Sequence, residues 1–455
     1  MRRSESMRFT APQVADAAAI AERMIRWSAI ANRVPGVAYG LSHDGTTVLL
    51  GGFGAADLAS GRPVDVATTR FRCASITKTF TATLVLQQSE RGRLRLDDPV
   101  VDWLGWTKGL LDAQLTIRHL LMHAGSVNRD GSNDWSDRTM PDASKLREEL
   151  GRSATFGSPS ERFRYSNIGY ALLGEVLEAA TGRQFSTLLR RDIATRLGMS
   201  STSADLTAAA RRSLATGYFW TWPGEEPRPA AQVAARAIAP AGGLVSTVGD
   251  LLEYQHAQLP GDPRLLSELS KREMQRPQWQ RAEPLHYGLG WMSWSVGGIS
   301  LAGHSGGFPG FTTMIGFSAE HRLAATVLTN SNASIAPPAL SMIYEVLGAV
   351  AQSWPDAAAP SRWHTRAALE GFSGLYRGHH GDLVVGRVNR ALAVGHPNEP
   401  FASASLLIAK APLRFLVTAG SDFGFLGETI RFRKDRSGKV TTMLWGAHEM
   451  ERAAL

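Results

Sequence analysis

Strand-like segments occur near both ends of the first 350 residues, with a helical stretch between them, and this distribution most constrains the fold. Residues 36–42 and 46–54 are predicted strands joined by His43-Asp44-Gly45, and an Asp-Gly pair is a strong hairpin signal. Further strands are expected near 285–296, 298–303, 311–317 and 323–329. We therefore expect one antiparallel sheet built from both ends around a helical insertion, which is an α+β fold. Helices are expected near 12–32, 75–91, 116–123, 143–151, 168–181, 184–196, 246–258 and 336–350.

The length of 455 residues predicts more than one domain, because a single hydrophobic core stops growing at roughly 250–300 residues. The segment 351–363 contains two prolines and three consecutive alanines, which is typical of a linker. Short β-type runs follow it, separated by turns such as Asp435-Arg436-Ser437-Gly438. We expect a catalytic-type domain at 1–350, a linker at 351–363 and a small β-barrel at 364–455.

Composition and charge exclude some classes of protein. Hydrophobic residues make up 44% of the chain and charged residues 20%, so a mainly disordered chain is excluded. Cys73 is the one cysteine, so no intramolecular disulfide can form. The net charge is +8, and only seven of the 49 basic residues are lysine. The basic residues are scattered, whereas nucleic-acid binding needs a clustered stripe, so no nucleic-acid partner is expected.

The N-terminal sequence does not predict an export signal. Residues 1–7 resemble the basic start of a signal peptide, but residues 8–32 mix charged and apolar positions as an amphipathic helix does. No run of 18 apolar residues occurs, so no membrane span is expected. The sequence favours a cytoplasmic protein without a membrane partner.

The first motif that indicates chemistry is Ser75-Ile76-Thr77-Lys78 at a predicted helix start. Residues three apart share one helix face, so the Lys78 amine can reach the Ser75 hydroxyl. A serine hydroxyl is a weak nucleophile until a neighbouring group takes its proton, and a helix N-terminus adds free N–H groups. The pattern alone is unspecific. However, it opens a mostly apolar helix that would bury Lys78, and a buried lysine needs a partner or a chemical role.

Two further motifs follow in the chain, Tyr165-Ser166-Asn167 and Gly303-His304-Ser305-Gly306-Gly307. Taken alone, the first is also typical of an aromatic strand end with an Asn turn. The second is also typical of a structural histidine in a Gly-rich turn. Glycines beside a histidine on a strand edge would, however, let a substrate backbone approach closely.

Taken together, the three motifs resemble the serine β-lactamase and penicillin-binding-protein superfamily, in its class C-like branch, peptidase family S12. The order is Ser-x-x-Lys, then Tyr-Ser-Asn about 90 residues later, then His-Ser-Gly about 140 further on. Residues 72–82, 120–125 and 240–247 look like the same family. The resemblance covers roughly residues 15–350, and the C-terminal residues look like the lipocalin-like β-barrel of such hydrolases.

The resemblance implies a role for each motif residue. Ser75 would be the acylated nucleophile, and Lys78 would help to deprotonate it. Tyr165 would act as general base and then as acid to the leaving group, as a phenolate or in a network that shares protons with Lys78. Asn167 would orient Lys78 and bind the substrate. His304 would lie across the cleft near Tyr165.

The resemblance also implies an oxyanion hole formed by the backbone N–H groups of Ser75 and Gly307, with Ser305 and Gly306 in the same substrate-binding segment. One departure concerns substrate choice. His304 replaces the lysine that recognises a substrate carboxylate in β-lactamases, and a histidine is only partly charged at neutral pH. β-Lactamase activity is therefore discounted.

Two further sequence features concern a histidine pair and a serine before Tyr165. His119 and His123 are spaced like metal ligands on a helix, but no HExxH motif and no third ligand is evident, so neither a metal nor another cofactor is expected. Ser160 lies where the family often has glycine, in the loop before Tyr165.

We therefore expect a serine hydrolase that acts through an acyl-enzyme on an ester, peptide or amide, as an esterase or a D-amino-acid-type peptidase. The alternative is a penicillin-binding-protein-type thioesterase or acyltransferase that cyclises a peptide. Its acyl substrate could be bound to a carrier protein. A β-lactamase or a non-catalytic binding protein is less expected. The sequence does not determine the oligomeric state.

Overall fold

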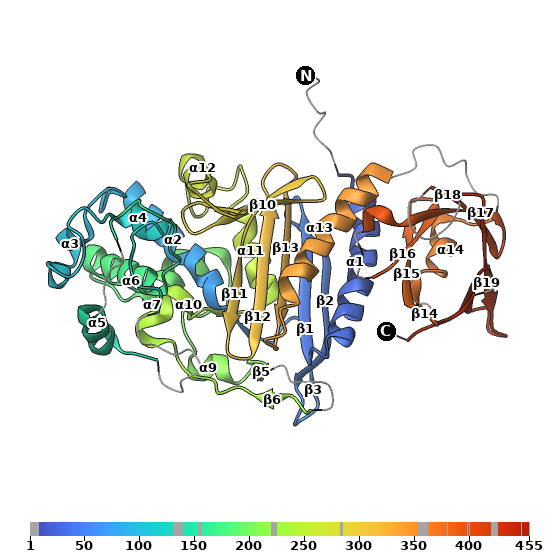
Figure 1. The fold of residues 1–455 in the computed structure, drawn as a ribbon, viewed down its shortest axis with the longest axis horizontal. Helices are drawn as coiled ribbons and strands as arrows, with labels where there is room; N and C mark the ends of the chain where they lie inside the picture. Colours follow the sequence, from blue (N-terminus) through green and yellow to red (C-terminus); the bar gives the residue numbers. More distant parts are fainter. Residues whose placement is uncertain are drawn as a thin grey trace, which may run out of the picture.

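The computed structural model describes residues 9–130, 140–152, 157–219, 225–282, 285–353, 363–379, 381–397, 399, 401–419, 426–446 and 448–454. A large antiparallel sheet lies at the centre, with most of the helices beside it and a separate barrel at the other end (Figure 1). The predicted α+β fold with an added β-barrel is therefore confirmed.

The central sheet joins strands from both ends of the catalytic region. Its order is β3-β2-β1-β13-β12-β11-β10-β9-β8, and β1 pairs antiparallel with β13. The strand bounds are β1 Gly36–His43, β2 Thr46–Asp57, β3 Arg62–Pro63, β8 Trp279–Ala282, β9 Leu285–Tyr287, β10 Met292–Val296, β11 Ile299–Phe308, β12 Phe311–Ser318 and β13 Leu323–Thr329. Asp44 and Gly45 have φ values of 49° and 77°, the left-handed conformation that a tight hairpin turn requires.

Two strand boundaries differ from expectation. The segment predicted as one strand at 285–296 is two strands, β9 and β10, with Gly290 at φ 82° between them. That left-handed conformation breaks an extended chain. β11 runs to Phe308 rather than ending at 303, because it continues to pair with β12 up to the tight turn at Pro309-Gly310. His304 therefore lies within a strand and not in a glycine-rich turn.

Helices cover both faces of the sheet. α1 (Ala11–Ala31) packs against α13 (Ala336–Ser353) on one face, and α11 (Val248–His256) contacts β1 and β13 on the other (Figure 1). Thr10 and Gln13 form a capping box that satisfies the first turn of α1. Further helical elements are α3 Val100–Trp103, η2 Gly105–Thr107, α4 Ile117–Leu121, α5 Ala143–Arg152, α6 Asn167–Thr181, α7 Phe185–Leu189, η3 Arg190–Ala194, α8 Thr195–Leu197, α9 Ala208–Arg211, η4 Arg236–Ile238, α10 Ala239–Gly242, α12 Glu268–Gln275, α14 Arg366–Glu370 and η5 Phe401–Ser403.

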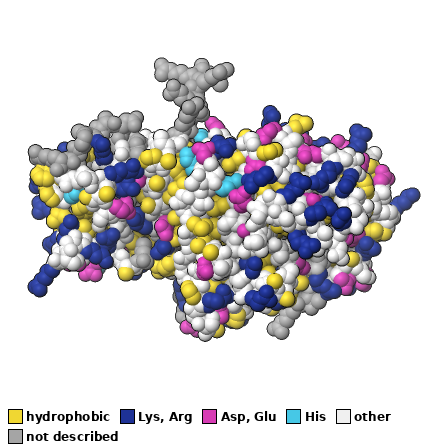
Figure 2. Space-filling view, turned by 180° about the vertical axis from the view of Figure 1, so that it is seen from behind, with side chains coloured by type: hydrophobic (Ala, Val, Ile, Leu, Met, Phe, Trp, Pro, Cys, Tyr) yellow, Lys and Arg dark blue, Asp and Glu magenta, His cyan; other side chains and the backbone are white. Residues whose placement is uncertain are grey.

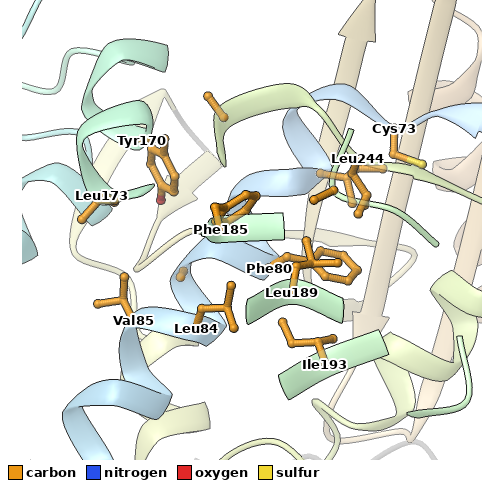
Figure 3. Packing of buried hydrophobic residues seen from close by; sticks show 14 of the residues in the cluster. Cys73, Phe80, Leu84, Val85, Tyr170, Leu173, Phe185, Leu189, Ile193 and Leu244 are labelled. Carbon is orange, nitrogen blue, oxygen red and sulfur yellow. The ribbon is translucent and has the colours of Figure 1, made fainter. Parts of the chain in front are cut away.

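The helix that carries the Ser-x-x-Lys motif is buried on all sides. α2 (Thr77–Glu90) has every residue from Thr77 to Gln88 buried. A helix without an exposed face must lie inside a domain core. Figure 3 shows apolar side chains of α2, among them Phe80 and Leu84, beside Leu189 and Ile193 of α7 and η3. This packing holds the start of α2 in a fixed place.

The C-terminal domain is a closed barrel with a packed interior. Its strands are β14 Gly374–Gly378, β15 Gly381–Val388, β16 Ala391–Gly395, β17 Ser405–Ala411, β18 Arg414–Ala419, β19 Thr429–Lys434, β20 Val440–Trp445 and β21 His448–Arg452. Phe372, Phe415 and Phe432 form a cluster with ring centroids 5.0–5.4 Å apart. Apolar side chains from the barrel strands surround it, so the barrel has its own hydrophobic core.

The boundaries between the domains remain predictions. α13 continues to Ser353, three residues into the segment expected to be a linker. Residues 354–362 of that segment lie outside the described residues.

An ion cluster joins α1 to the barrel. The Asp16 carboxylate has no exposed surface, and it lies 3.0 Å from Arg366 Nη2 and 2.5 Å from Arg387 Nη1. The backbone N–H of Asn389 donates to the same carboxylate at 2.8 Å. Trp27 of α1 donates its indole N–H to Asp382 of β15 at 2.7 Å. α1 therefore contacts both the central sheet and the barrel.

Replacing Asp16 with alanine is expected to lower the free energy of unfolding by about 3 kcal/mol, because Arg387 loses its buried counter-charge and keeps only the partly exposed Glu370. Urea unfolding followed by circular dichroism measures the effect. Glu148→Ala is the control, because Glu148 pairs with Lys145 on the surface and exposed pairs contribute little. Equal losses in the two variants would contradict the expectation.

Within the described residues, no helix is long and apolar enough to cross a membrane. On the face in Figure 2, acidic side chains lie among the basic ones over the larger domain.

Candidate active site

Ser75 lies on a tight turn between a short strand and a buried helix. β4 (Phe71–Arg72) pairs with β7 (Val245–Ser246), and the 3₁₀ turn η1 (Ala74–Ile76) leads directly into α2. Ala74 has a φ of 48°, which is uncommon for a residue with a side chain. Strained backbone of this kind persists only where the surroundings enforce it, and it is frequent at functional sites.

Three hydrogen bonds enforce that turn. The Cys73 N–H donates to the Leu244 carbonyl at 2.8 Å. The Thr77 hydroxyl donates to the Ala74 carbonyl and accepts from the Leu244 N–H at 3.0 Å. The Cys73 side chain is fully buried beside this turn, and burial raises the pKa of its thiol. Cys73 is therefore a packing residue.

Lys78 is fully buried directly beneath Ser75. Its Nζ lies 3.2 Å from Ser75 Oγ, 2.6 Å from Asn167 Oδ1 and 2.8 Å from the Ala241 carbonyl oxygen. Burial holds the pKa of the Lys78 ammonium well below its ordinary value. A neutral amine has two N–H donors and one lone pair. When Lys78 is neutral, the two carbonyl oxygens take its donors, and its lone pair faces the Ser75 hydroxyl and can accept the hydroxyl proton.

A second buried lysine shows what is particular about Lys78. Lys271 of α12 is also buried, and its Nζ donates to the carbonyl oxygens of Leu259 and Asp262 and to the Glu268 carboxylate. All three partners are acceptors, which suits a structural ammonium group. Lys78 instead has a hydroxyl as its third partner.

Asn167 links Lys78 to an acidic residue that the sequence did not single out. Its Oδ1 accepts from Lys78, and its Nδ2 donates to Asp130 Oδ1. The other carboxylate oxygen of Asp130 accepts from Arg129 Nε at 2.9 Å. Asn167 therefore contacts Lys78 through its amide oxygen, while its amide nitrogen already has a protein partner.

Tyr165 lies beside the same two residues. The Ser75 side chain acts on its hydroxyl and lowers its pKa, and Lys78 Nζ lies 4.7 Å from the centre of its ring. Burial raises the pKa of Tyr165, so the resting side chain is a neutral phenol. Of the two states expected for Tyr165, this geometry favours the network that shares protons with Lys78 over a resting phenolate.

His304 faces this group from β11, and its ring is neutral. Its Nδ1–H donates to the Ser305 carbonyl at 2.6 Å, and its Nε2 accepts from the Tyr287 hydroxyl at 3.1 Å. Burial lowers the pKa of His304 to about 3. The sequence-based expectation of a partly charged imidazole is therefore wrong, because the strand places the ring in the interior rather than at the surface.

These residues line a cleft of about 250 Å³. Its walls are formed by Ala74, Ser75, Arg129, Tyr165, Asn167, Gly242, Arg281, Met292, His304, Ser305 and Gly307. Gly306 does not line it: a Cβ there would lie 2.1 Å from the Cys73 carbonyl oxygen. Gly306 thus allows β11 to pack closely against the turn that carries Ser75, whereas Gly307 borders open space.

A comparison with family models matches residues 17–345 to the model described as Beta-lactamase. The match covers most of the chain and includes all three motifs. The chain belongs to the beta-lactamase family. The predicted resemblance to the serine β-lactamase and penicillin-binding-protein superfamily is confirmed.

Similar proteins in this family differ in their described activities. The chain is 28% identical over 61% of its length to penicillin-binding protein 4* of Bacillus subtilis. It is 26% identical over 73% of its length to a D-aminopeptidase of Cereibacter sphaeroides. The matches span 64% and 63% of those two proteins, so the chain matches less than two thirds of each. A solved structure, the D-amino acid amidase of Ochrobactrum anthropi, superposes with a TM-score of 0.64 at 25% identity, covering 72% of this chain and 97% of the amidase.

Two arginines were missed by the sequence analysis because they come from segments without a motif. Arg129 follows α4 in the chain and is balanced by its ion pair with Asp130. Arg281 comes from β8, where its guanidinium lies 3.8 Å from Met292 Sδ, and its charge acts on Tyr165 and His304. In this beta-lactamase family member the positive charge at the cleft surface therefore comes from arginines and not from the β11 histidine.

The histidines considered as metal ligands have separate partners. α4 ends at Leu121, so His119 and His123 are not on one continuous helix. His119 Nδ1 accepts from Thr116 N–H, and its Nε2 lies 2.9 Å from Ser160 Oγ. Among the described residues, no group of three or more His, Cys, Asp and Glu side chains could hold a metal ion.

Ser160 adopts a φ of 64°, the left-handed conformation for which glycine is best suited. The structure thus explains why the position favours glycine. A serine remains there with its N–H bonded to the Ala124 carbonyl at 2.8 Å.

Proposed function

We propose that this chain is a family S12 serine hydrolase that cleaves an amide or peptide bond beside a D-configured residue through an acyl-enzyme on Ser75. The observation that carries the proposal is the buried Lys78 amino group, whose Nζ lies 3.2 Å from Ser75 Oγ and is held by the Asn167 and Ala241 carbonyl oxygens. This arrangement activates a serine hydroxyl. The D-aminopeptidase relative and the D-amino acid amidase structure support the choice of D-configured amides.

In the acylation step, Ser75 Oγ attacks the substrate carbonyl carbon and its proton passes to Lys78 Nζ. The backbone N–H groups of Ser75 and Gly307 receive the developing oxyanion. The C–N bond then breaks as the Tyr165 hydroxyl protonates the leaving nitrogen, and the proton held by Lys78 passes to the resulting Tyr165 phenolate, whose ring lies beside Nζ. The products are the acyl-enzyme and a free amine.

Water completes the cycle. It attacks the acyl carbon, its proton passes to the Lys78–Tyr165 pair, and the ester bond to Ser75 Oγ breaks as that oxygen is protonated. An acceptor amine in place of water would give transfer or cyclisation, which is the alternative to hydrolysis. The neutral His304 argues against recognition of a β-lactam carboxylate at that position.

The test is a panel of substrates that vary in configuration or in leaving group. D- and L-phenylalanine amide compare the two configurations. Amides of N-acetyl-D-alanine whose leaving group is ammonia, D-alaninamide or D-alanine compare the leaving groups. We expect D-amides to be hydrolysed at least about 10-fold faster than L-amides. Rates are measured by chromatography of the free acid. Equal rates for both configurations, or hydrolysis of esters alone, would contradict the proposal.

The leaving-group series has a matched variant. Arg281 lies on the cleft wall, and its charge acts on Tyr165. For the substrate whose leaving group carries a carboxylate, kcat/KM is expected to be about 10-fold lower in Arg281→Met than in the wild type. For the substrate whose leaving group is the corresponding amide, kcat/KM is expected to be unchanged. Arg414→Met, an exposed change on the barrel, is the control. Equal effects on both leaving groups would exclude recognition by Arg281.

A peptidyl thioester with a free N-terminus tests the alternative, cyclisation. A linear acid as the main product would exclude cyclisation.

A further inference from the structure

His123 lies at the centre of the aromatic group around the active site, and the proposed mechanism does not use it. It is 1% exposed and follows the end of α4 with a φ of 58°. A histidine in the left-handed region is uncommon and costs backbone energy. Its conformation is therefore held in place by contacts with the surrounding residues.

Those contacts surround Tyr165. The His123 carbonyl accepts from the Arg164 N–H at 2.7 Å, and its Nδ1 accepts from the Ser166 N–H at 3.0 Å. The imidazole also packs on the Tyr165 ring, with centroids 4.2 Å apart and planes 35° apart. His123 thus holds the residue before Tyr165, the residue after it and its side chain. The positive φ turns the carbonyl and the side chain toward the same segment.

The ring of His123 is fixed in one protonation state. Nδ1 accepts a hydrogen bond, so the single ring proton is on Nε2. Burial lowers the pKa of His123 well below its ordinary value. The ring also lies 5.1 Å from Tyr170 and 4.8 Å from Tyr287 between centroids. A neutral, packed imidazole is a rigid support for a neighbouring phenol.

We propose that His123 is a positioning residue that holds the Tyr165 hydroxyl where it can protonate the leaving group. The role rests on the proposed function but not on the identity of the substrate. Misplacing a catalytic group by about 1 Å can cost about 100-fold in rate. The loss is expected only where the leaving group needs a proton, because the attack of Ser75 is assisted by Lys78.

The experiment compares His123→Leu and His123→Asn with the wild type on a D-amino acid amide and on the p-nitrophenyl ester of the same acid. For the amide, kcat is expected to fall about 100-fold in His123→Leu with KM nearly unchanged. For the ester the fall in kcat/KM, which reports acylation, is expected to be smaller than about 5-fold, because nitrophenolate leaves without protonation. Asparagine keeps an acceptor for the Ser166 N–H and tolerates a positive φ. The kcat for the amide is therefore expected to be about 10-fold higher in His123→Asn than in His123→Leu.

His119→Asn, the same change at a histidine outside the cleft, is the matched control. Fluorophosphonate labelling of Ser75 is measured in parallel, and it is expected to persist in every His123 variant because fluoride needs no acid to leave. Equal losses on amide and ester, or unchanged amide hydrolysis, would overturn the role of His123. A wild type that is neither labelled nor active on either substrate would overturn the proposed function, and with it this role.

Discussion

Replacing Ser75 with alanine is expected to abolish the acyl-enzyme and to lower kcat on the best substrate by about 10⁴-fold or more. The expectation follows from geometry. Ser75 Oγ is the hydroxyl 3.2 Å from the Lys78 amine, and it lies on the cleft wall with Gly307. Without that oxygen, Lys78 has no nucleophile to deprotonate.

Mass spectrometry after fluorophosphonate treatment measures the effect. The wild type should gain one adduct on the peptide that contains Ser75, and Ser75→Ala should gain none. Ser300→Ala, an exposed serine on β11 outside the cleft, should label like the wild type. Labelling that survives in Ser75→Ala would place the nucleophile elsewhere.

Removing the Lys78 amine is expected to lower kcat/KM by about 10³-fold, within the range of general base catalysis. Lys78→Met removes the base. Lys78→Arg keeps a cation that is always protonated and cannot accept the Ser75 proton, so both variants are expected to be equally impaired. If Lys78→Arg retained most of the activity, the lysine would act only as a positive charge.

The pH profile identifies the base independently. Burial lowers the pKa of Lys78, so the amine is neutral above that lowered pKa, and kcat/KM is expected to fall as the pH drops through it. His304, with a pKa of about 3, stays neutral throughout the range from pH 5 to 9. His304→Gln is therefore expected to reduce the rate without moving the acidic limb. If the acidic limb of the kcat/KM profile disappeared in His304→Gln, the group that titrates there would be His304 and not Lys78.

The strand pattern and the motif order were sufficient to predict the architecture. The hairpin at Asp44-Gly45, the strands of residues 311–329 and the helix of residues 12–32 were each predicted within a few residues. Their signals are local, because a turn residue or an apolar period acts within a few positions. The barrel after residue 363 was predicted for the same reason, from short strands separated by turns.

The boundary errors have a common cause. The break between β9 and β10 and the continuation of β11 to Phe308 depend on pairing with strands distant in the sequence. Local propensity does not carry that information. The early end of α4 before His123 likewise depends on the bonds of His123 to residues 164 and 166.

The sequence by itself was sufficient to predict the family, and it named Ser75, Lys78, Tyr165 and His304 as candidate site residues, because they belong to motifs whose order is unusual. Only the tertiary structure decided what state each group is in. The fold buries Lys78 beside Ser75, which lowers the pKa of Lys78, and it keeps His304 neutral. It also gives both ends of the Asn167 amide a protein partner and packs the His123 ring on Tyr165. The physical reason is that protonation follows burial and neighbouring dipoles, and both arise from segments that meet only when the chain is folded.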